Sequence, residues 1–357
     1  MTDPLNPIQP DETKYEPLTP ADRPKSQWRR WHIPVLVFLA IASYLIVTKQ
    51  NKVPYQTAEG TIFGTFYHLT YQSRDDLQAG VEAELLRVDS SLSMFNPSSI
   101  ISRVNRDEDV EVDSLFRTVW RKAAEVYRLT NGAFDITCAP LVNAWGFGFR
   151  QSEFPTPHII DSLLAFVGMD KVRMEGTRIV KDDPRTLLDC SAIAKGFGSD
   201  CVAALFESLG IRNYMVEIGG EVVVRGVNPK GNHWRIGINR PTDDSLSLSN
   251  ELDTILSLTD CGLATSGNYR NFYIREGRRY AHTVDPRLGY PVQHAVLSAT
   301  VIAPTCMEAD ALATSFMVIG SDSARIIVDA RRDLRAYLIL SADSAGYTTL
   351  RLGRWEE

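Results

Sequence analysis

The stretch of sequence that decides the fold is NYMVEIGGEVVVRGVNPKGNHWRIGINRP (213–241). Three runs rich in β-branched and apolar residues follow one another in it without an intervening helix: Tyr214–Ile218, Glu221–Arg225 and Trp234–Asn239. Glycines separate the first two runs, and an Asn-Pro-Lys-Gly turn signal precedes the third. Because strands that adjoin in sequence pair antiparallel, this stretch favours an α+β fold over a doubly wound parallel sheet.

Further elements are predicted on both sides of this stretch. Apolar residues at helical spacing predict helices over 81–92, 115–129, 157–167, 307–318 and 323–330, and another that begins with Ser191 as N-cap and stops at Gly210. β-branched and aromatic runs predict strands at 62–71, 186–190, 254–259, 269–275, 279–284 and 298–303, and a closing hairpin of 336–340 with 347–352. Together they predict mixed or antiparallel sheets packed against helices.

The overall composition excludes several classes of protein. The 357 residues are 44% hydrophobic and 23% charged, which is ordinary for a globular domain. The net charge of −6 argues against a nucleic-acid partner, because such a partner requires a basic surface. The cysteines are five in number, widely scattered and without CxxC spacing, which argues against a disulfide framework or a zinc site.

An apolar run, IPVLVFLAIASYLIV (33–47), precedes the globular part. Counted from Trp31 to Thr48, it reaches the lower length limit of a transmembrane helix, and no polar stripe interrupts it. Basic residues are denser in its N-terminal flank, and this asymmetry keeps that end in the cytoplasm. The run therefore predicts one N-terminal transmembrane helix.

The expected order along the chain is a disordered cytoplasmic tail (1–30), a transmembrane anchor (31–48) and a globular domain (58–357). The domain would then lie on the extracytoplasmic, or periplasmic, side of the cytoplasmic (inner) membrane, as part of a single-pass protein. Two alternatives stay open for the apolar run, namely a signal peptide that is cleaved off and a buried core helix.

Two segments combine groups that suit phosphate or metal chemistry. In DCSAIAKG (189–196), small residues open a helix, so an anion could reach free N–H groups beside Lys195. Asp310 and Thr314 share one helix face, and hard oxygen ligands of this kind suit Mg²⁺ or Ca²⁺. Each segment has an ordinary alternative: a tightly packed strand–helix junction for the first, and complementation of the helix dipole for the second.

A third candidate is His282, which ends a predicted strand just before a turn that contains Asp285. A histidine held by a loop carboxylate can act as a general base, whereas a strand-end histidine bonded to backbone is the ordinary alternative. Segments 132–137 and 217–221 place glycines beside acidic residues, which indicates turns at least as readily as sites. None of these patterns specifies a reaction by itself.

Taken together and in order, eight stretches resemble the FAD:protein FMN transferase family, often called ApbE. They are GTFYHLTY (64–71), LSMFNPSSIISRVN (92–105), NGAFDITCAPLVNAWGFG (131–148), LDCSAIAKGFGSD (188–200), the opening stretch (213–241), ATSGNYRNF (264–272), RYAHTVDPRLGYPV (279–292) and APTCMEADALATSFMVIG (303–320). The likeness extends from about residue 60 to about residue 340 and implies an ApbE-type fold.

The resemblance implies a magnesium-dependent transfer of FMN from FAD to a threonine hydroxyl of an acceptor protein, with release of AMP. Carried over by position, the FAD contacts fall on Phe63, Phe95, Ala133, Phe134, Asp135, Asp189, Lys195, His282 and Thr283. The ligands of the Mg²⁺ ion fall on Asp310, Thr314 and the backbone carbonyl of Ala192. The catalytic role falls on His282, as the base that deprotonates the acceptor threonine.

The chain departs from the family pattern in several places. Phe63 stands where the family usually has Met, and Phe95 where it usually has Tyr, so a hydroxyl is lost there. No cysteine occurs in the first 130 residues, so an anchor helix would replace the usual lipid. No acceptor-like D/S-G-x-[ST]-x-T segment is present, and self-flavinylation is therefore not expected.

Two other functions use much of the same site. Some members of the family hydrolyse FAD, so a Mg²⁺-dependent FAD pyrophosphatase that makes FMN and AMP is one alternative. A flavin-binding protein without turnover is the other. The presence of Lys195, His282, Asp310 and Thr314 argues against the second, because a protein that only binds flavin needs no base.

Overall fold

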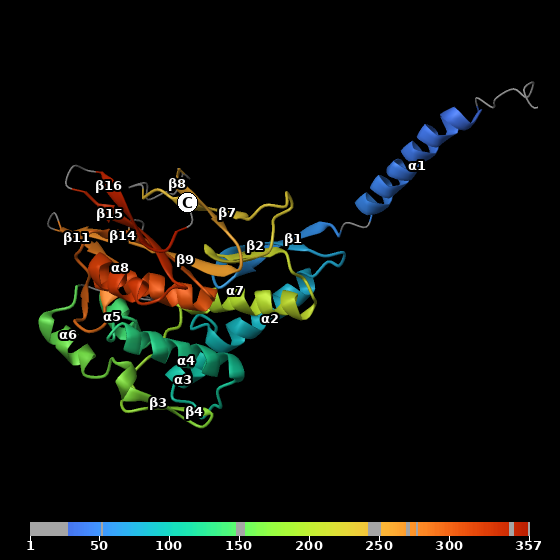
Figure 1. Cartoon of the computed structure of the whole chain (residues 1–357). Coiled ribbons are helices and arrows are strands. Elements are labelled where there is room, and N and C mark those ends of the chain that lie inside the picture. Colours follow the sequence, from blue (N-terminus) through green and yellow to red (C-terminus); the bar gives the residue numbers. More distant parts are fainter. Residues whose placement is uncertain are drawn as a thin grey trace, which may run out of the picture. The chain divides into compact units, whose positions relative to one another are not determined.

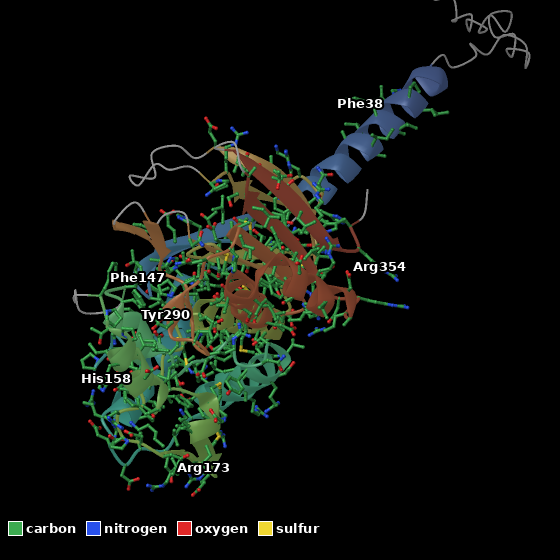
Figure 2. All side chains as sticks on the ribbon, turned by 90° about the vertical axis from the view of Figure 1, so that its left-hand side faces the viewer. Phe38, Phe147, His158, Arg173, Tyr290 and Arg354 are labelled. Carbon is green, nitrogen blue, oxygen red and sulfur yellow. The ribbon has the colours of Figure 1, made fainter. Side chains whose placement is uncertain are left out.

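The computed structural model describes residues 28–50, 53–147, 154–241, 251–268, 272–275, 278–342 and 346–355. The chain divides into two units, Met1–Val53 and Pro54–Glu357. The first unit contains helix α1 (Trp28–Gln50), whose apolar side chains between residues 33 and 41, Phe38 among them, project outward and are exposed (Figure 2). Except for the start of α1, the predicted tail (1–30) lies outside the described residues.

The second unit is built on a sheet with the strand order β1-β2-β5-β6-β9-β14-β15-β16 (Figure 1). Every neighbouring pair in this sheet is antiparallel, which confirms the predicted α+β fold with antiparallel pairing. The strands are β1 (Tyr55–Ile62), β2 (Thr65–Gln72), β5 (Tyr214–Ile218), β6 (Glu221–Arg225), β9 (Cys261–Gly267), β14 (Val296–Ala303), β15 (Arg335–Ser341) and β16 (Tyr347–Gly353).

Helices and hairpins cover the two faces of this sheet. The hairpins are β3 (Val172–Glu175) with β4 (Arg178–Lys181), β7 (Trp234–Asn239) with β8 (Leu252–Leu258), β10 (Phe272–Arg275) with β11 (Arg278–Ala281), and β12 (Val284–Asp285) with β13 (Tyr290–Pro291). The helices are α2 (Gln78–Leu92), α3 (Ile100–Asn105), α4 (Ser114–Leu129), α5 (Ala139–Ala144), α6 (Pro157–Leu164), α7 (Ala194–Ser208) and α8 (Cys306–Asp329). Figure 1 shows α7 and α8 on one face and the β7–β8 hairpin over the other.

The alternation of side chains along the strands explains these layers. Val216 and Ile218 of β5 join a buried cluster with Phe206 of α7. On the opposite face, Val222 of β6 and Trp234 of β7 belong to a separate cluster. Because successive side chains of a strand point to opposite faces, the same central strands contribute to a core on each side.

Helix α8 is the central helix of the second unit. Within the described part of the chain, α8 is long and apolar enough to cross a membrane, but 56% of its apolar window is buried inside the protein, whereas His32–Ser43 of α1 counts as a shorter apolar helix. Gly320 interrupts it with non-helical angles (φ 76°, ψ 178°), in agreement with the two separate helices predicted here. Its hydrophobicity therefore reflects its place in the core.

Several predicted elements differ from the structure. The strand predicted at 62–71 is β2, preceded by a turn at Phe63-Gly64, where both residues have positive φ. The prediction of a strand at 186–190 is wrong. The backbone of this segment forms hydrogen bonds with the side chain of Asn105 and the carbonyl of Ile136, and it pairs with no strand among the described residues. The predicted cap is also wrong: Ile193 precedes α7, and Ser191 lies in a turn in which its N–H donates to Asp189.

Replacement of Gly196 by Ala is expected to destabilise the second unit by about 1–3 kcal/mol. A Cβ atom at Gly196 would lie 2.4 Å from the backbone oxygen of Cys306, where α7 packs against the start of α8. Chemical denaturation measures the effect. Gly80→Ala in α2 is the control, because its Cβ would meet nothing closer than 3.8 Å and the substitution favours the helix. Equal stability of the two variants would contradict this account of the α7–α8 contact.

Candidate active site

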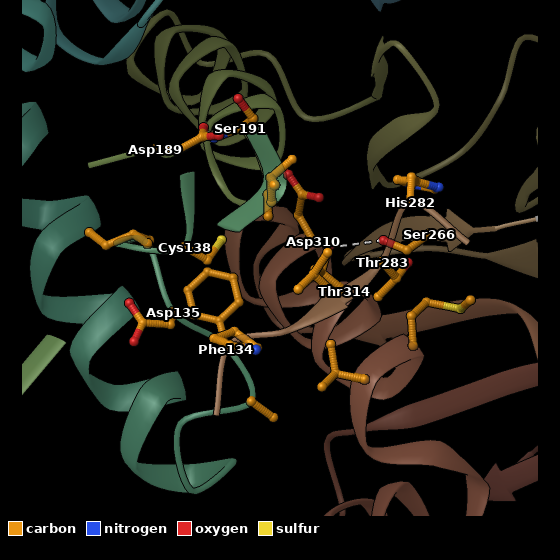
Figure 3. A pocket seen from close by; sticks show the side chains of 18 of the residues that line it. Phe134, Asp135, Cys138, Asp189, Ser191, Ser266, His282, Thr283, Asp310 and Thr314 are labelled. Carbon is orange, nitrogen blue, oxygen red and sulfur yellow. Dashed lines mark hydrogen bonds between the residues drawn. The ribbon is translucent and has the colours of Figure 1, made fainter. Parts of the chain in front are cut away.

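A cavity of about 420 Å³ lies where segments from distant parts of the second unit meet. Its walls come from the loop after α4, the turn that leads into α7, the end of β9, the turn after β11 and one face of α8 (Figure 3). Most of the predicted site residues line it, namely Ala133, Phe134, Asp135, Asp189, Ala192, Lys195, His282, Thr283, Asp310 and Thr314. The fold thus brings together residues that are far apart in sequence.

Phe63 and Phe95, which are predicted FAD contacts, do not line this cavity. Phe63 lies in the β1–β2 turn, where its ring is partly buried against the core and close to Gly198 of α7. Phe95, between α2 and α3, is 68% exposed. The structure therefore separates these two aromatic residues from the rest of the predicted site.

The α8 wall supplies the predicted metal ligands. Asp310 is buried, and its Oδ2 accepts a hydrogen bond from the N–H of Gly196 at 3.0 Å. The hydroxyl of Thr314, one turn further along, lies 3.1 Å from the hydroxyl of Ser266, as the dashed line in Figure 3 shows. Burial raises the pKa of Asp310, while Lys195 and the Gly196 N–H oppose this shift.

The donor chemistry of this wall fits a hard cation. No group of three or more His, Cys, Asp or Glu side chains that could hold a metal occurs among the described residues. One carboxylate with hydroxyl and carbonyl oxygens nevertheless suits Mg²⁺, which usually keeps several waters and takes further ligands from substrate phosphates. Asp310, Thr314 and the carbonyl of Ala192 are therefore a suitable partial ligand set.

Lys195 is held by Glu221, a carboxylate of the candidate segment 217–221 that is not among the predicted FAD or metal contacts. Its Nζ lies 3.0 Å from Oε1 of Glu221, whose side chain comes from the start of β6 and lines the same cavity. Burial lowers the pKa of Lys195, but Asp310 and Glu221 raise it by more, so the net shift is upward and the amine stays charged. A permanent positive charge in the cavity wall favours an anionic ligand.

Glu221 itself is only 4% exposed, and its buried Oε2 has no hydrogen-bond partner among the described residues. Burial and the neighbouring Asp310 raise the pKa of Glu221, whereas Lys195 lowers it. The segment 217–221 was a candidate from its glycines and acidic residues, but no local pattern indicates a pair between residues 26 positions apart. This unsatisfied oxygen marks a place where a bound group would gain a contact.

The two other predicted acidic residues stabilise their own loops. Asp135 accepts hydrogen bonds from the N–H and hydroxyl of Thr137 and from the N–H of Met169. Burial raises the pKa of Asp135, and these bonds oppose the shift. Asp189 accepts from the N–H of Ser191 at 2.8 Å. Asp189 therefore shapes its own turn, whereas Asp135 shapes its loop and also ties that loop to Met169, 34 positions along the chain.

His282 lies in the cavity wall at an intermediate exposure, with its ring edge-on to Phe147 at a centroid distance of 6.4 Å. The carboxylate of Asp285, expected to orient this histidine, instead binds the guanidinium of Arg287 at 2.7 and 2.9 Å. The proximity in sequence was misleading, because Asp285 and Arg287 close the same turn. His282 thus lines the cavity, but Asp285 does not orient it.

Asp200, on α7 outside the cavity lining, accepts hydrogen bonds from the N–H groups of Cys306 and Met307 at the start of α8. Burial raises its pKa to about 7 from the ordinary value of 3.8, although these bonds lower it. Between about pH 4 and pH 7 the folded state therefore holds a proton that the unfolded state has lost, so stability falls as the pH rises.

Replacement of Asp200 by Asn is expected to remove this part of the pH dependence. As the pH rises from 4 to 8, the unfolding free energy of the wild type should fall by a few kcal/mol relative to that of the variant. Urea denaturation at several pH values measures it. A difference that stays constant across this range would show that Asp200 ionises normally in the folded protein.

The sequence of this chain is similar to a known family and to named proteins. The sequence profile of the ApbE family matches residues 63–338. A protein from Haemophilus influenzae named FAD:protein FMN transferase is 36% identical over 329 residues, which cover 87% of this chain and 94% of that protein. A protein of the same name from Vibrio cholerae is 37% identical over 306 residues, which cover 82% of this chain and 90% of that one.

Solved structures show the same fold. The flavin transferase ApbE from Vibrio cholerae superposes with a TM-score of 0.75 at 35% identity, over 84% of this chain and 97% of that chain. The apo form of the Pseudomonas stutzeri flavinyl transferase ApbE also gives a TM-score of 0.75, at 30% identity, over 84% of this chain and 95% of that one.

Proposed function

Since this chain belongs to the ApbE family, whose named members are FAD:protein FMN transferases, we propose that it transfers FMN from FAD to a threonine hydroxyl of an acceptor protein. The proposed reaction depends on Mg²⁺ and releases AMP. The observation that carries this proposal is the convergence of Lys195, Asp310, Thr314 and His282 on one cavity.

The proposed step converts the phosphoanhydride bond of FAD into a phosphodiester bond to threonine. The threonine Oγ forms a bond to the phosphorus of the FMN half of FAD, and the bond from that phosphorus to the oxygen of the AMP half breaks. AMP leaves with the bonding electron pair, and the hydroxyl proton passes to His282. A threonine hydroxyl is a weak nucleophile, so a positioned base is needed to take this proton.

The charged side chains of the cavity serve the pyrophosphate. Lys195 is held in place by Glu221 and directs its positive charge toward the cavity, where it would stabilise the negative charge that develops on the phosphate oxygens. When bound, a Mg²⁺ ion on Asp310, Thr314 and the Ala192 carbonyl would neutralise charge on the same group. Binding and charge neutralisation dominate catalysis of phosphoryl transfer.

The cavity also has an apolar wall that suits a flavin or adenine ring. Phe134 and Ile136 contribute to it from the loop after α4, and Met317 and Val318 from α8. Ligand pockets of this kind combine a mainly apolar lining with a few oriented polar groups.

We further propose that residues 31–48 anchor the protein in the cytoplasmic membrane with the second unit on the extracytoplasmic side. The exposed apolar side chains along α1, such as Ile33, Leu36 and Phe38, support this proposal. Transfer of such side chains from water to hydrocarbon is favourable. The basic residues on the N-terminal flank favour a cytoplasmic N-terminus. Fusion of a reporter active only outside the cytoplasm to the C-terminus tests the orientation, and an inactive reporter would overturn it.

The central experiment incubates the full chain with FAD, Mg²⁺ and a synthetic peptide that contains Ser-Gly-Ala-Thr-Ala-Thr. We expect flavin fluorescence on the peptide together with an equal amount of released AMP, and loss of both when a chelator removes the metal. AMP release without a fluorescent peptide would favour the FAD pyrophosphatase. The absence of both products would count against either enzymatic function.

A further inference from the structure

A second hollow of about 590 Å³ lies on the sheet face opposite α7 and α8, beneath the β7–β8 hairpin. On one side it is bounded by side chains of β5, β6 and β9 that share a face of the sheet, namely Met215, Glu217, Val222, Leu263 and Thr265. On the other side it is bounded by β7 and by Leu252 of β8. We call this hollow the β7 groove.

The β7 groove follows the edge of a strand. Five consecutive residues of β7, Arg235 to Asn239, line it. They alternate between exposed and buried, because successive side chains point to opposite faces. Residues from both faces can border one groove only if the groove runs along the strand's edge. Within the described residues, β7 pairs only with β8, so no strand of the described chain occupies its other edge.

The β7 groove continues into the candidate active site. Gly219, Thr265 and Gly267 line both the groove and the 420 Å³ cavity. A Cβ atom added to Gly220, which also lines the groove, would meet no atom within 4 Å. The passage between the two hollows is therefore bordered by backbone and a short threonine side chain, so another polypeptide could approach closely.

We propose that an extended segment of the acceptor protein adds to this other edge of β7 and carries its threonine past Gly219 and Gly220 to the phosphate. This inference rests on the proposed function and names the mode of binding of its protein partner. Added strands gain affinity from backbone hydrogen bonds and selectivity from alternate side chains. The glycines at the passage favour an acceptor with small residues beside the threonine. Glu217 and Arg235 would interact with charged side chains further along the acceptor segment.

The first test uses the full chain, FAD, Mg²⁺ and two N-methylated forms of the Ser-Gly-Ala-Thr-Ala-Thr peptide. One form carries methyl groups on every second backbone nitrogen and the other on the intervening nitrogens. A strand paired on one side donates only alternate N–H groups to its neighbour. We expect KM to rise about tenfold or more for one form and to change little for the other, relative to the unmethylated peptide. Equal KM values for the two forms would overturn the proposal.

The second test reads binding without turnover. Hydrogen exchange of the amides in 234–239 is expected to slow when the unmethylated peptide is added in excess. Unchanged exchange at saturating peptide would overturn the proposal, whether or not flavin is transferred. Exchange that slows with protein concentration alone would assign the edge to a second copy of the chain and would overturn it as well. Failure of the proposed function would instead appear as the absence of both AMP and flavinylated peptide.

A side-chain variant supplies a matched comparison. Arg235→Glu is expected to raise KM several-fold for a peptide with flanking aspartates and to leave the Kd of FAD unchanged, because Arg235 lines the β7 groove and not the cavity. Lys230→Glu, in the exposed turn before β7, makes the same charge change outside the groove. Identical KM values for the two variants would count against recognition along β7.

Discussion

Asp310→Asn is expected to lower the rate of AMP release by on the order of 10³-fold or more. The substitution removes the carboxylate charge that would hold Mg²⁺, while its amide oxygen can still accept the hydrogen bond from Gly196. The fold should therefore persist. Steady-state release of AMP from FAD measures the effect, and titration with Mn²⁺ followed by its electron paramagnetic resonance signal should show weaker ion binding without any turnover.

Asp200→Asn is the matched control for this experiment. Asp200 is also a largely buried carboxylate that accepts backbone N–H groups, but it does not line the cavity. Its variant should bind Mn²⁺ and release AMP as the wild type does. If Asp310→Asn kept near-normal activity and ion affinity, the assignment of α8 as the metal-binding wall would be wrong.

His282→Ala is expected to slow flavin transfer by about 10²–10⁴-fold, the usual contribution of a general base. The Kd of FAD should change much less than the transfer rate, because the apolar wall and Lys195 still hold FAD. Transfer to the peptide is measured by flavin fluorescence, and FAD binding by quenching of that fluorescence.

The control for this variant is His158→Ala, at an exposed histidine on α6 that does not line the cavity. It should transfer flavin at the wild-type rate. A parallel loss of FAD binding and transfer in His282→Ala would assign His282 to ligand binding. A loss of transfer alone supports its role as the base.

The predicted strands that are rich in apolar and β-branched residues and bounded by turn signals agree with the structure. Tyr214–Ile218, Glu221–Arg225 and Trp234–Asn239 are strands with the predicted limits, because each has a regular pattern and a turn signal at its ends. The central strand β9 was missed. Its sequence, CGLATSG, is rich in small residues because the start of α8 presses on it: a Cβ at Gly262 would lie 2.2 Å from the backbone nitrogen of Cys306.

Strand β1 was missed for a similar reason. Its sequence, YQTAEGTI, has few apolar residues, and Gly60 within it leaves room for the ring of Tyr67 on β2. Small or polar residues lower the β-propensity of a segment, but pairing with neighbouring strands overrides this preference. Contacts outside the segment itself therefore decided both strands: with the neighbouring β2 for β1, and with β14 and the start of α8 for β9.

The amino-acid sequence by itself determined many of the local elements of this protein and their antiparallel pairing, and its family resemblance named ten of the residues that line the cavity. Only the tertiary structure decided how those residues are combined. The bond between Asp310 and Gly196 joins positions 114 residues apart, and the pair of Lys195 with Glu221 joins a helix to a strand. The tertiary structure also pairs the carboxylate of Asp285 with the guanidinium of Arg287, and it leaves Phe95 exposed and outside the cavity. Local periodicity reports burial along one element, whereas ion pairs and cavities depend on how several elements pack together.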